Sequence, residues 1–246
     1  QCSILGTHYN ITLPPRLTSI GTKAFSGCGI YTIALPVGIN IGTHAFRECT
    51  NLISITCVPA TMNTLPEGLT FIGESAFAKC SSLTDITFPE GLISIGGQAF
   101  RDCSKLVRIT LPEGLETIET KAFWGCISLV HITLPEGLTT IDAYAFGGCS
   151  SLNNITWPEG LNSIINGTFF DCESLTSITL PEGLEHIAQY AFHNCSSLTS
   201  ITFPDTLKTI DGGVFKNCTG LTSITLPEGL TSIEGGVFEN CTGLTS

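Results

Sequence analysis

The stretch LPEGLTTIDAYAFGGCSSLNNIT, residues 134–156, decides the fold because close copies of it fill most of the chain. Alignment on its cysteine gives the 23-residue unit L-P-E-G-L-x-x-I-x-x-x-A-F-x-x-C-x-x-L-x-x-I-x. Ten copies begin near Leu13, Leu35, Leu65, Phe88, Leu111, Leu134, Trp157, Leu180, Phe203 and Leu226. A fixed period of this length is typical of a solenoid, in which each unit forms one coil.

Eight positions in every unit are apolar, and they make stacking necessary. A single unit buries too little apolar surface to offset the conformational entropy lost on ordering it. In a stack, each coil covers the apolar face of its neighbour and the core becomes continuous. We therefore expect one solenoid over residues 1–246. Its repeats are irregular in 1–64, with an insertion near 58–65, and regular in 65–246, where the last one is truncated.

The unit predicts a strand and a short helix. The segment L-T-S-I-T-L alternates and is rich in β-branched residues, as in a short strand, and P-E-G supplies a turn. The segment A-F-x-x-C-x-x-L has helical spacing. The expected fold is an α/β repeat solenoid with a parallel sheet on its concave face and helices on the opposite side.

This repeat resembles the BspA-type leucine-rich repeats of bacterial and protist surface proteins, and the resemblance runs from Leu13 to Ser246. It implies a right-handed leucine-rich-repeat horseshoe of about ten repeats, with the strands on the inner face. It also implies a secreted or cell-surface protein that takes part in adhesion or recognition, often of host or matrix proteins.

Composition excludes several classes of function. The formal net charge is −11, so phosphate backbones and anionic membranes would repel the chain, and no nucleic-acid partner is expected. No apolar run approaches the roughly 20 residues that cross a bilayer. The sequence contains no G-x-S-x-G, H-E-x-x-H or P-loop motif, which predicts a protein that is not an enzyme and needs no cofactor.

The twelve cysteines do not form a disulfide pattern. Ten of them occupy one repeated position: Cys28, Cys49, Cys80, Cys103, Cys126, Cys149, Cys172, Cys195, Cys218 and Cys241. We expect buried thiols that pack as small hydrophobes and bind no metal, because the spacing offers no C-x-x-C pair. Cys2 and Cys57 lie outside this column, and a Cys2–Cys28 disulfide stays open as an alternative.

Acidic residues recur in the P-E-G turn of the regular coils: Glu67, Glu90, Glu113, Glu136, Glu159, Glu182, Asp205 and Glu228. Stacked carboxylates could collect calcium. Since each coil offers only one acid at this turn, we interpret the column as a solvated edge that keeps the protein soluble.

A first candidate binding surface lies on the strands. In the column before the inward isoleucine, small hydroxyl residues give way on four successive coils to Asp85, Arg108, His131 and Asn154. Large polar groups on a rigid concave sheet predict a ligand-binding strip. The alternative is a structural ladder with an exposed Asp85–Arg108 pair that contributes little.

A second candidate surface lies on the side predicted to be helical. Trp124, Phe170 and His193 stand two residues before the cysteine, and Tyr144 and Tyr190 stand two before the phenylalanine. Stacking brings these aromatic residues together, which is typical of protein interfaces. The competing interpretation is that the rings merely pack over small glycines.

Sequons for N-linked glycans occur at Asn10, Asn154, Asn166, Asn194, Asn217 and Asn240. The last three share one repeat position, so their number partly reflects duplication.

Two functions follow from these features. The first is a non-catalytic module at the cell surface or outside the cell that binds a protein or glycan ligand. The alternative is a structural subunit whose uncapped ends stack on other copies of the chain and give an extracellular filament.

Overall fold

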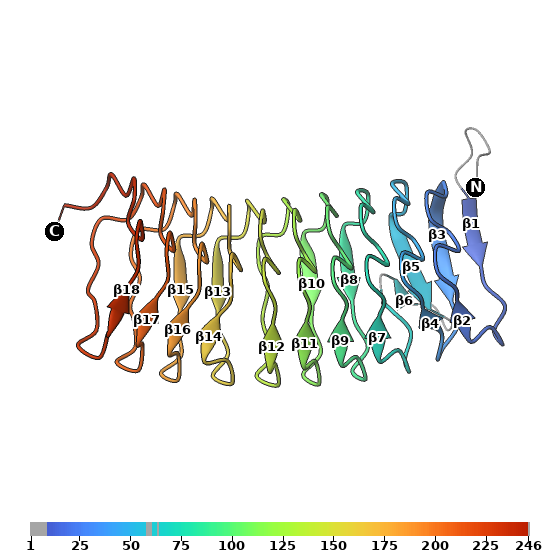
Figure 1. Cartoon of the computed structure of the whole chain (residues 1–246). Helices are drawn as coiled ribbons and strands as arrows, with labels where there is room; N and C mark the ends of the chain where they lie inside the picture. The colour runs from blue at the N-terminus through green and yellow to red at the C-terminus, as the bar shows by residue number, and fades with distance from the viewer. Residues whose placement is uncertain (1–8, 58–60, 63, 246) are drawn as a thin grey trace.

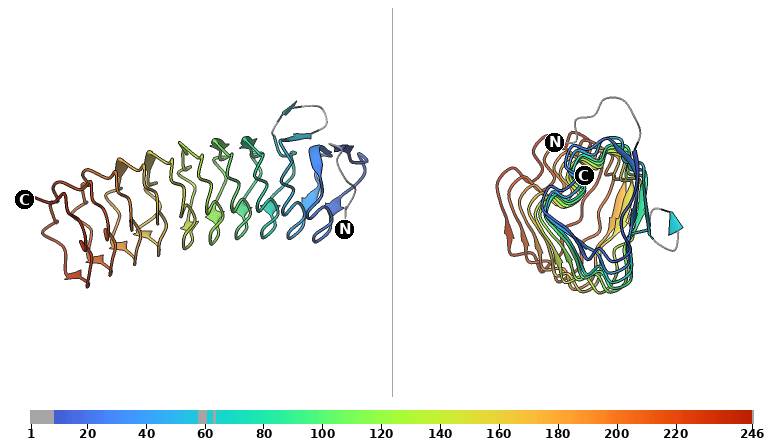
Figure 2. Two further views of the ribbon diagram at one scale, coloured as in Figure 1. Left: turned by 90° about the horizontal axis from the view of Figure 1, so that it is seen from above. Right: turned by 90° about the vertical axis from the view of Figure 1, so that its right-hand side faces the viewer.

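The computed structural model describes residues 9–57, 61–62 and 64–245, and it shows a long stack of coils (Figure 1). Each repeat forms one coil, and consecutive repeats lie side by side along the axis of the solenoid. Viewed along that axis, the coils superpose around a common interior (Figure 2). The fold is a parallel β-solenoid of about ten coils.

Two ladders of short parallel strands run along the solenoid, although the sequence predicted only one. The first ladder contains β1 (Tyr9–Thr12), β3 (Ile30–Leu35), β5 (Ser54–Cys57), β8 (Asp85–Thr87), β10 (Arg108–Thr110), β13 (Asn154–Thr156) and β15 (Ser177–Thr179). The second contains β2 (Ser19–Ile20), β4 (Asn40–Ile41), β7 (Phe71–Ile72), β9 (Ser94–Ile95), β11 (Thr117–Ile118), β12 (Thr140–Ile141), β14 (Ser163–Ile164), β16 (His186–Ile187), β17 (Thr209–Ile210) and β18 (Ser232–Ile233). Most coils therefore pair with a neighbour in both ladders, although the first ladder ends at β15 and the second is interrupted between β12 and β14.

The predicted α/β class with a helical side is wrong. The described residues contain no helix, and therefore none that could cross a membrane. The A-F-x-x-C segment forms consecutive turns, and we call the surface that it makes the turn face. The turn face comprises residues 22–28, 43–49, 74–80, 97–103, 120–126, 143–149, 166–172, 189–195, 212–218 and 235–241.

Hydrogen bonding explains why the turn face is not helical. Within 75–80, the amides of Ala76, Ala78 and Cys80 donate to carbonyls three residues earlier, while those of Ser75, Phe77 and Lys79 donate to the next coil. Ser75 and Lys79 also have left-handed φ values of 53° and 61°. A helix this short would leave most of its terminal amides and carbonyls unpaired, whereas this alternation pairs them.

The interior is a stack of identical layers. Ten phenylalanines, from Phe25 to Phe238, stack one per coil with ring centroids 5.2–6.0 Å apart. Between Phe46 and Phe215 these rings are completely buried, as are most of the repeated leucines and cysteines. The insertion after the second repeat contributes β6 (Thr61–Met62), which pairs antiparallel with β5 and projects from the solenoid (Figure 2).

Candidate functional site

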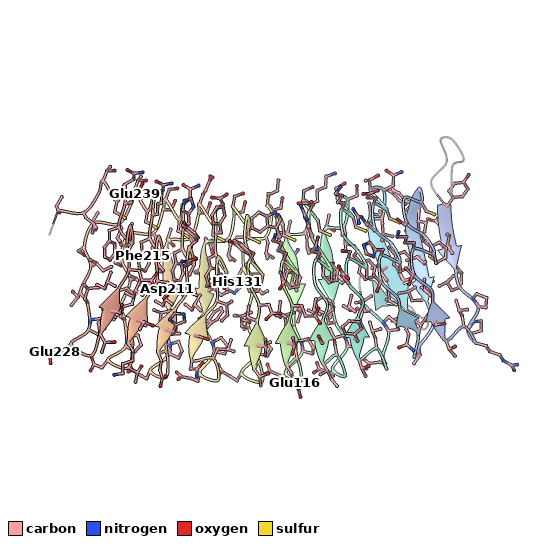
Figure 3. All side chains as sticks on the ribbon, viewed as in Figure 1. Glu116, His131, Asp211, Phe215, Glu228 and Glu239 are labelled. Carbon is pink, nitrogen blue, oxygen red and sulfur yellow. The ribbon has the colours of Figure 1, made fainter. Side chains whose placement is uncertain are left out.

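The first ladder places the predicted polar strip in one line. Arg108 lies opposite Asp85 in the parallel register, and isolated bridges join Arg108 to His131 and His131 to Asn154. His131 Nδ1 lies 2.9 Å from Asn154 Oδ1, and the hydroxyl of Thr84 donates to Asp85 Oδ2 at 2.9 Å. Arg108, His131 and Asn154 are exposed, and Figure 3 shows His131 on the strand face. The four side chains are neighbours on one surface.

The structure adds apolar residues that the sequence analysis did not select. Val107 and Val130 are 40% and 39% exposed and precede Arg108 and His131, and Ile127 is 49% exposed in the same coil as Val130. Most other coils carry threonine or serine at these two positions. These three apolar residues depart from the repeat, so the sequence alone could have identified them. They make this part of the strip amphipathic.

The five predicted aromatic residues form one continuous cluster on the turn face, which we call the aromatic patch. The Phe170 ring stacks on His193 at 4.6 Å and on Trp124 at 6.1 Å. Tyr144 meets Trp124 edge-on at 5.7 Å and Phe170 at 6.1 Å, and Tyr190 meets His193 at 5.8 Å. The patch therefore joins four successive coils through direct ring contacts.

Three rings of the patch lie over glycines of the next coil. A methyl group on Gly147 would clash with the Trp124 ring. A methyl group on Gly167 would meet the Tyr144 ring, and one on Gly213 would come within 2.5 Å of the Tyr190 ring. These contacts support packing over glycines, but they do not bury the patch, since Tyr190 is 41% exposed and the other four rings are half-buried.

Both tyrosines adopt a backbone conformation that is costly for a bulky residue. Tyr144 and Tyr190 have φ values of 60° and 58°. The equivalent residue is left-handed in every other coil too: Lys23, His44, Ser75, Gln98, Lys121, Gly167, Gly213 and Gly236. The left-handed conformation is therefore part of the repeat and does not single out the tyrosines. Lys121 Nζ lies 5.6 Å from the Trp124 ring and 5.3 Å from the Tyr144 ring, so a cation also borders the patch.

His193 connects the aromatic patch to polar groups. Its Nδ1 lies 3.8 Å from Asp171 Oδ1, and its Nε2 lies 3.4 Å from the side-chain nitrogen of Asn217. Burial lowers the pKa of His193 below its ordinary value of 6.5, although the Asp171 carboxylate acts in the opposite direction. The imidazole is therefore neutral at pH 7 and stacks on Phe170 as an uncharged ring.

The sequons occupy different environments. Asn10 and Asn154 are exposed on the first ladder, and Asn166 is exposed on a turn. At the repeated position, Asn194 Nδ2 donates to Asp171 Oδ1 at 3.1 Å, and Asn240 Nδ2 donates to Asn217 Oδ1 at 2.9 Å. At Asn194 and Asn240, therefore, the nitrogen that would carry a glycan already donates a hydrogen bond between coils.

The cysteine column forms a chain of hydrogen bonds inside the solenoid. Each thiol from Cys49 to Cys241 donates to the carbonyl of the phenylalanine in the preceding coil, at 3.0–3.3 Å. Burial raises the pKa of the Cys103 and Cys149 thiols to about 12, so they stay protonated and unreactive. Cys2 lies outside the described residues, and the Cys2–Cys28 disulfide stays a prediction.

The part of the chain that the structure describes contains no candidate metal site. There, no three His, Cys, Asp or Glu side chains are grouped so that they could hold an ion. Glu228 lies on the P-E-G turns at the edge of the solenoid, well separated from Glu239 on the turn face (Figure 3).

Comparison with known proteins agrees with the fold. A family profile described as BspA type leucine rich repeat region, in six copies, matches residues 5–68, 56–156 and 139–246. Among solved structures, a leucine-rich repeat protein from Bacteroides ovatus is 28% identical over 95% of this chain, with a TM-score of 0.74. The chain spans 64% of the length of that protein.

Two further solved structures share the fold at lower identity. A leucine-rich repeat protein from Eubacterium ventriosum is 21% identical, with 94% of this chain and 82% of that chain covered and a TM-score of 0.61. The pneumococcal vaccine antigen PcpA is 21% identical, with coverage of 97% and 71% and a TM-score of 0.60. None of the curated proteins matches significantly. The chain belongs to the BspA-type leucine-rich repeat family.

Proposed function

We propose that this chain is a non-catalytic, protein-binding module of a secreted or cell-surface protein, and that the aromatic patch is its main contact surface. The observation that carries the proposal is the continuous contact of five rings across four coils on an otherwise polar face. Aromatic side chains are enriched at protein interfaces because they bury a large area with few rotatable bonds. The extracellular setting rests on the family.

The arrangement of the rings favours a protein ligand over a stacked sugar. Trp124 and His193 lie on coils on opposite sides of Phe170 and stack on it from both sides. A ligand therefore meets mainly the edge of the Phe170 ring. The same ligand can also contact the exposed Tyr190 and the ammonium group of Lys121. Apolar and acidic side chains complement such a surface.

Binding to purified matrix proteins tests the proposal. Immobilised fibronectin, laminin, fibrinogen and collagen are exposed to the wild-type chain and to the triple variant Trp124→Ala, Tyr144→Ser, Phe170→Ala. All three replacements occur naturally in the corresponding columns, with alanine at Ala78 for Trp124 and Phe170 and serine at Ser75 for Tyr144. We expect binding to at least one protein, weakened about tenfold or more in the triple variant.

A matched control removes exposed apolar surface elsewhere. Phe71 and Ile93 are each 46% exposed, and the variant Phe71→Ser, Ile93→Thr should bind like the wild type. Equal loss in both variants, equal binding by the triple variant and the wild type, or no binding to any of the four proteins contradicts the proposal.

The polar strip is a second candidate surface. It is favoured by the exposed Val107 and Val130 beside Arg108 and His131, which replace the residues usual at these positions. The variant Arg108→Ala, His131→Ala tests it on the same four proteins, and unchanged binding of every ligand would exclude this surface. Assembly into filaments stays a prediction.

A further inference from the structure

The turn face carries a second feature, a hollow of about 150 Å³ upstream of the aromatic patch. Three cationic side chains from three successive coils line it, Arg47, Lys79 and Arg101. The rest of its lining is small or neutral and consists of Ser75, Ala78 and Gln98. The cations therefore converge on one shared space rather than project separately into solvent.

Acidic neighbours hold these cations in place without covering them. Arg47 Nε and Lys79 Nζ lie 3.5 and 3.4 Å from the same oxygen of Glu48, and Arg101 Nε lies 3.3 Å from Asp102 Oδ2. The three cationic side chains remain 39%, 47% and 40% exposed. A guanidinium has five N–H donors and an ammonium has three, so donors remain for a ligand.

Positive charge is concentrated on this part of an acidic protein. The whole chain has ten Lys and Arg residues against 21 Asp and Glu. Five of the ten lie on the turn face of the first five coils, one per coil: Lys23, Arg47, Lys79, Arg101 and Lys121. The same turn face carries only three acids there: Glu48, Glu74 and Asp102. Since coils are about 4.8 Å apart, the cations form a row along the axis.

We propose that the hollow binds a sulfate group of a linear sulfated glycan, and that Lys23 and Lys121 contact further sulfates along the row. A tetrahedral sulfate ester presents three terminal oxygens, which suits three cations converging from three coils. A carboxylate presents two oxygens in one plane, which suits a single guanidinium. Glu48 and Asp102 at the hollow favour a singly charged sulfate ester over a doubly charged phosphate monoester.

Titration with heparin, followed by calorimetry, tests this site. The variant Arg47→Gln, Arg101→Gln should bind heparin about tenfold more weakly or worse, because it removes two charge-assisted contacts. The control Lys105→Gln, Lys208→Gln removes the same charge from exposed residues outside the turn face and should bind within about twofold of the wild type. Equal losses in the two variants would mean general attraction to a polyanion and would overturn the site.

Two further ligands identify the chemistry. Inorganic sulfate should compete with heparin for the wild-type chain, whereas poly-L-glutamate of matched charge should bind much more weakly. If poly-L-glutamate binds as tightly as heparin, the hollow recognises acidic proteins and the glycan assignment is wrong. The triple variant of the aromatic patch keeps both arginines, so failure of matrix-protein binding and failure of heparin binding are separate results. Circular dichroism confirms that each variant is folded.

Discussion

At the scale of single residues, the repeated cysteine combines two roles. Its small apolar side chain fills the interior between the phenylalanine stack and the leucine column. Its S–H group donates a second hydrogen bond to the phenylalanine carbonyl of the preceding coil, which already accepts one from a backbone amide. The carbonyl of Phe100, for example, accepts the amide of Cys103 at 3.2 Å and the thiol of Cys126 at 3.2 Å. Alanine would leave a void and valine has no donor, so neither replaces it fully.

Replacement of a central cysteine should therefore destabilise the whole solenoid. We expect Cys126→Ala to lower the free energy of unfolding by about 1–2 kcal/mol, through the lost hydrogen bond and the void. Urea unfolding followed by circular dichroism measures this change. Cys241 makes the same bond to Phe215 at 3.0 Å but is only half-buried, so Cys241→Ala should cost less. Equal costs would show that burial is not the main contribution.

The pKa of His193 provides a second test at this scale. The Asp171 carboxylate raises it and the Lys216 ammonium lowers it, against the larger lowering by burial. Asp171→Asn should therefore lower the pKa further, and Lys216→Met should raise it, as measured by NMR titration of the imidazole. Because the folded pKa lies below 6.5, the contribution of His193 to stability is complete above pH 6.5 and is lost as the pH falls through the folded pKa. Shifts in the same direction in both variants would contradict this assignment.

At the scale of the element, the turn face shows where sequence patterns were ambiguous. The inward residues Phe77, Cys80, Leu83 and Ile86 recur at intervals of three, whereas an amphipathic helix mixes intervals of three and four. A uniform interval of three fits a chain of turns, with the left-handed residues supplying the bends. The second ladder was missed for a related reason, because two-residue strands such as Ser94–Ile95 are too short to show alternation.

The packing of Trp124 over Gly147 gives a prediction for the turn face. Gly147→Ala places a methyl group against the indole, too close for both to fit, so the ring must leave the surface of the next coil. We expect a red-shifted fluorescence emission and a loss of about 1 kcal/mol of stability from the broken ring contacts. Gly91→Ala is the matched control, because its methyl group would meet nothing within 4 Å. Unchanged emission from Gly147→Ala would show that Trp124 does not lie over this glycine.

At the scale of the whole molecule, the 23-residue period alone predicted the stacking, the buried columns and the clustering of the five aromatic residues. Residues of one column must become neighbours when coils stack, so Trp124, Phe170 and His193 could be grouped from the sequence. The hollow lined by Arg47, Lys79 and Arg101 could not be predicted from the sequence. Lys79 stands in a different column from the two arginines, and the insertion near 58–65 interrupts the period between Arg47 and Lys79. Contacts between columns depend on the geometry of the turns, which the pattern did not reveal.

Alkaline pH should unfold the solenoid cooperatively, because the buried thiols run along most of its length. Burial raises the pKa of seven of them above the ordinary value of 9.0, to about 12 for Cys103, Cys149 and Cys218. As the pH rises above 9 the unfolded chain loses these protons while the folded chain keeps them, so stability is complete below pH 9 and falls above it.

The expected slope follows from the number of thiols. Each thiol lowers the free energy of unfolding by about 1.4 kcal/mol per pH unit. Seven thiols together lower it by about 10 kcal/mol per pH unit, which is comparable to the total stability of an ordinary domain. Urea unfolding in the presence of reductant at pH 8.0, 9.0, 9.5 and 10.0 should therefore show a steep loss of stability within one to two pH units above 9. Cys149→Ala should reduce the slope by the share of one thiol, about 1.4 kcal/mol per pH unit. A free energy of unfolding that stays constant from pH 8 to 10 would mean that the cysteine column is not sealed from solvent, and the continuous core would then have to be abandoned as the source of stability.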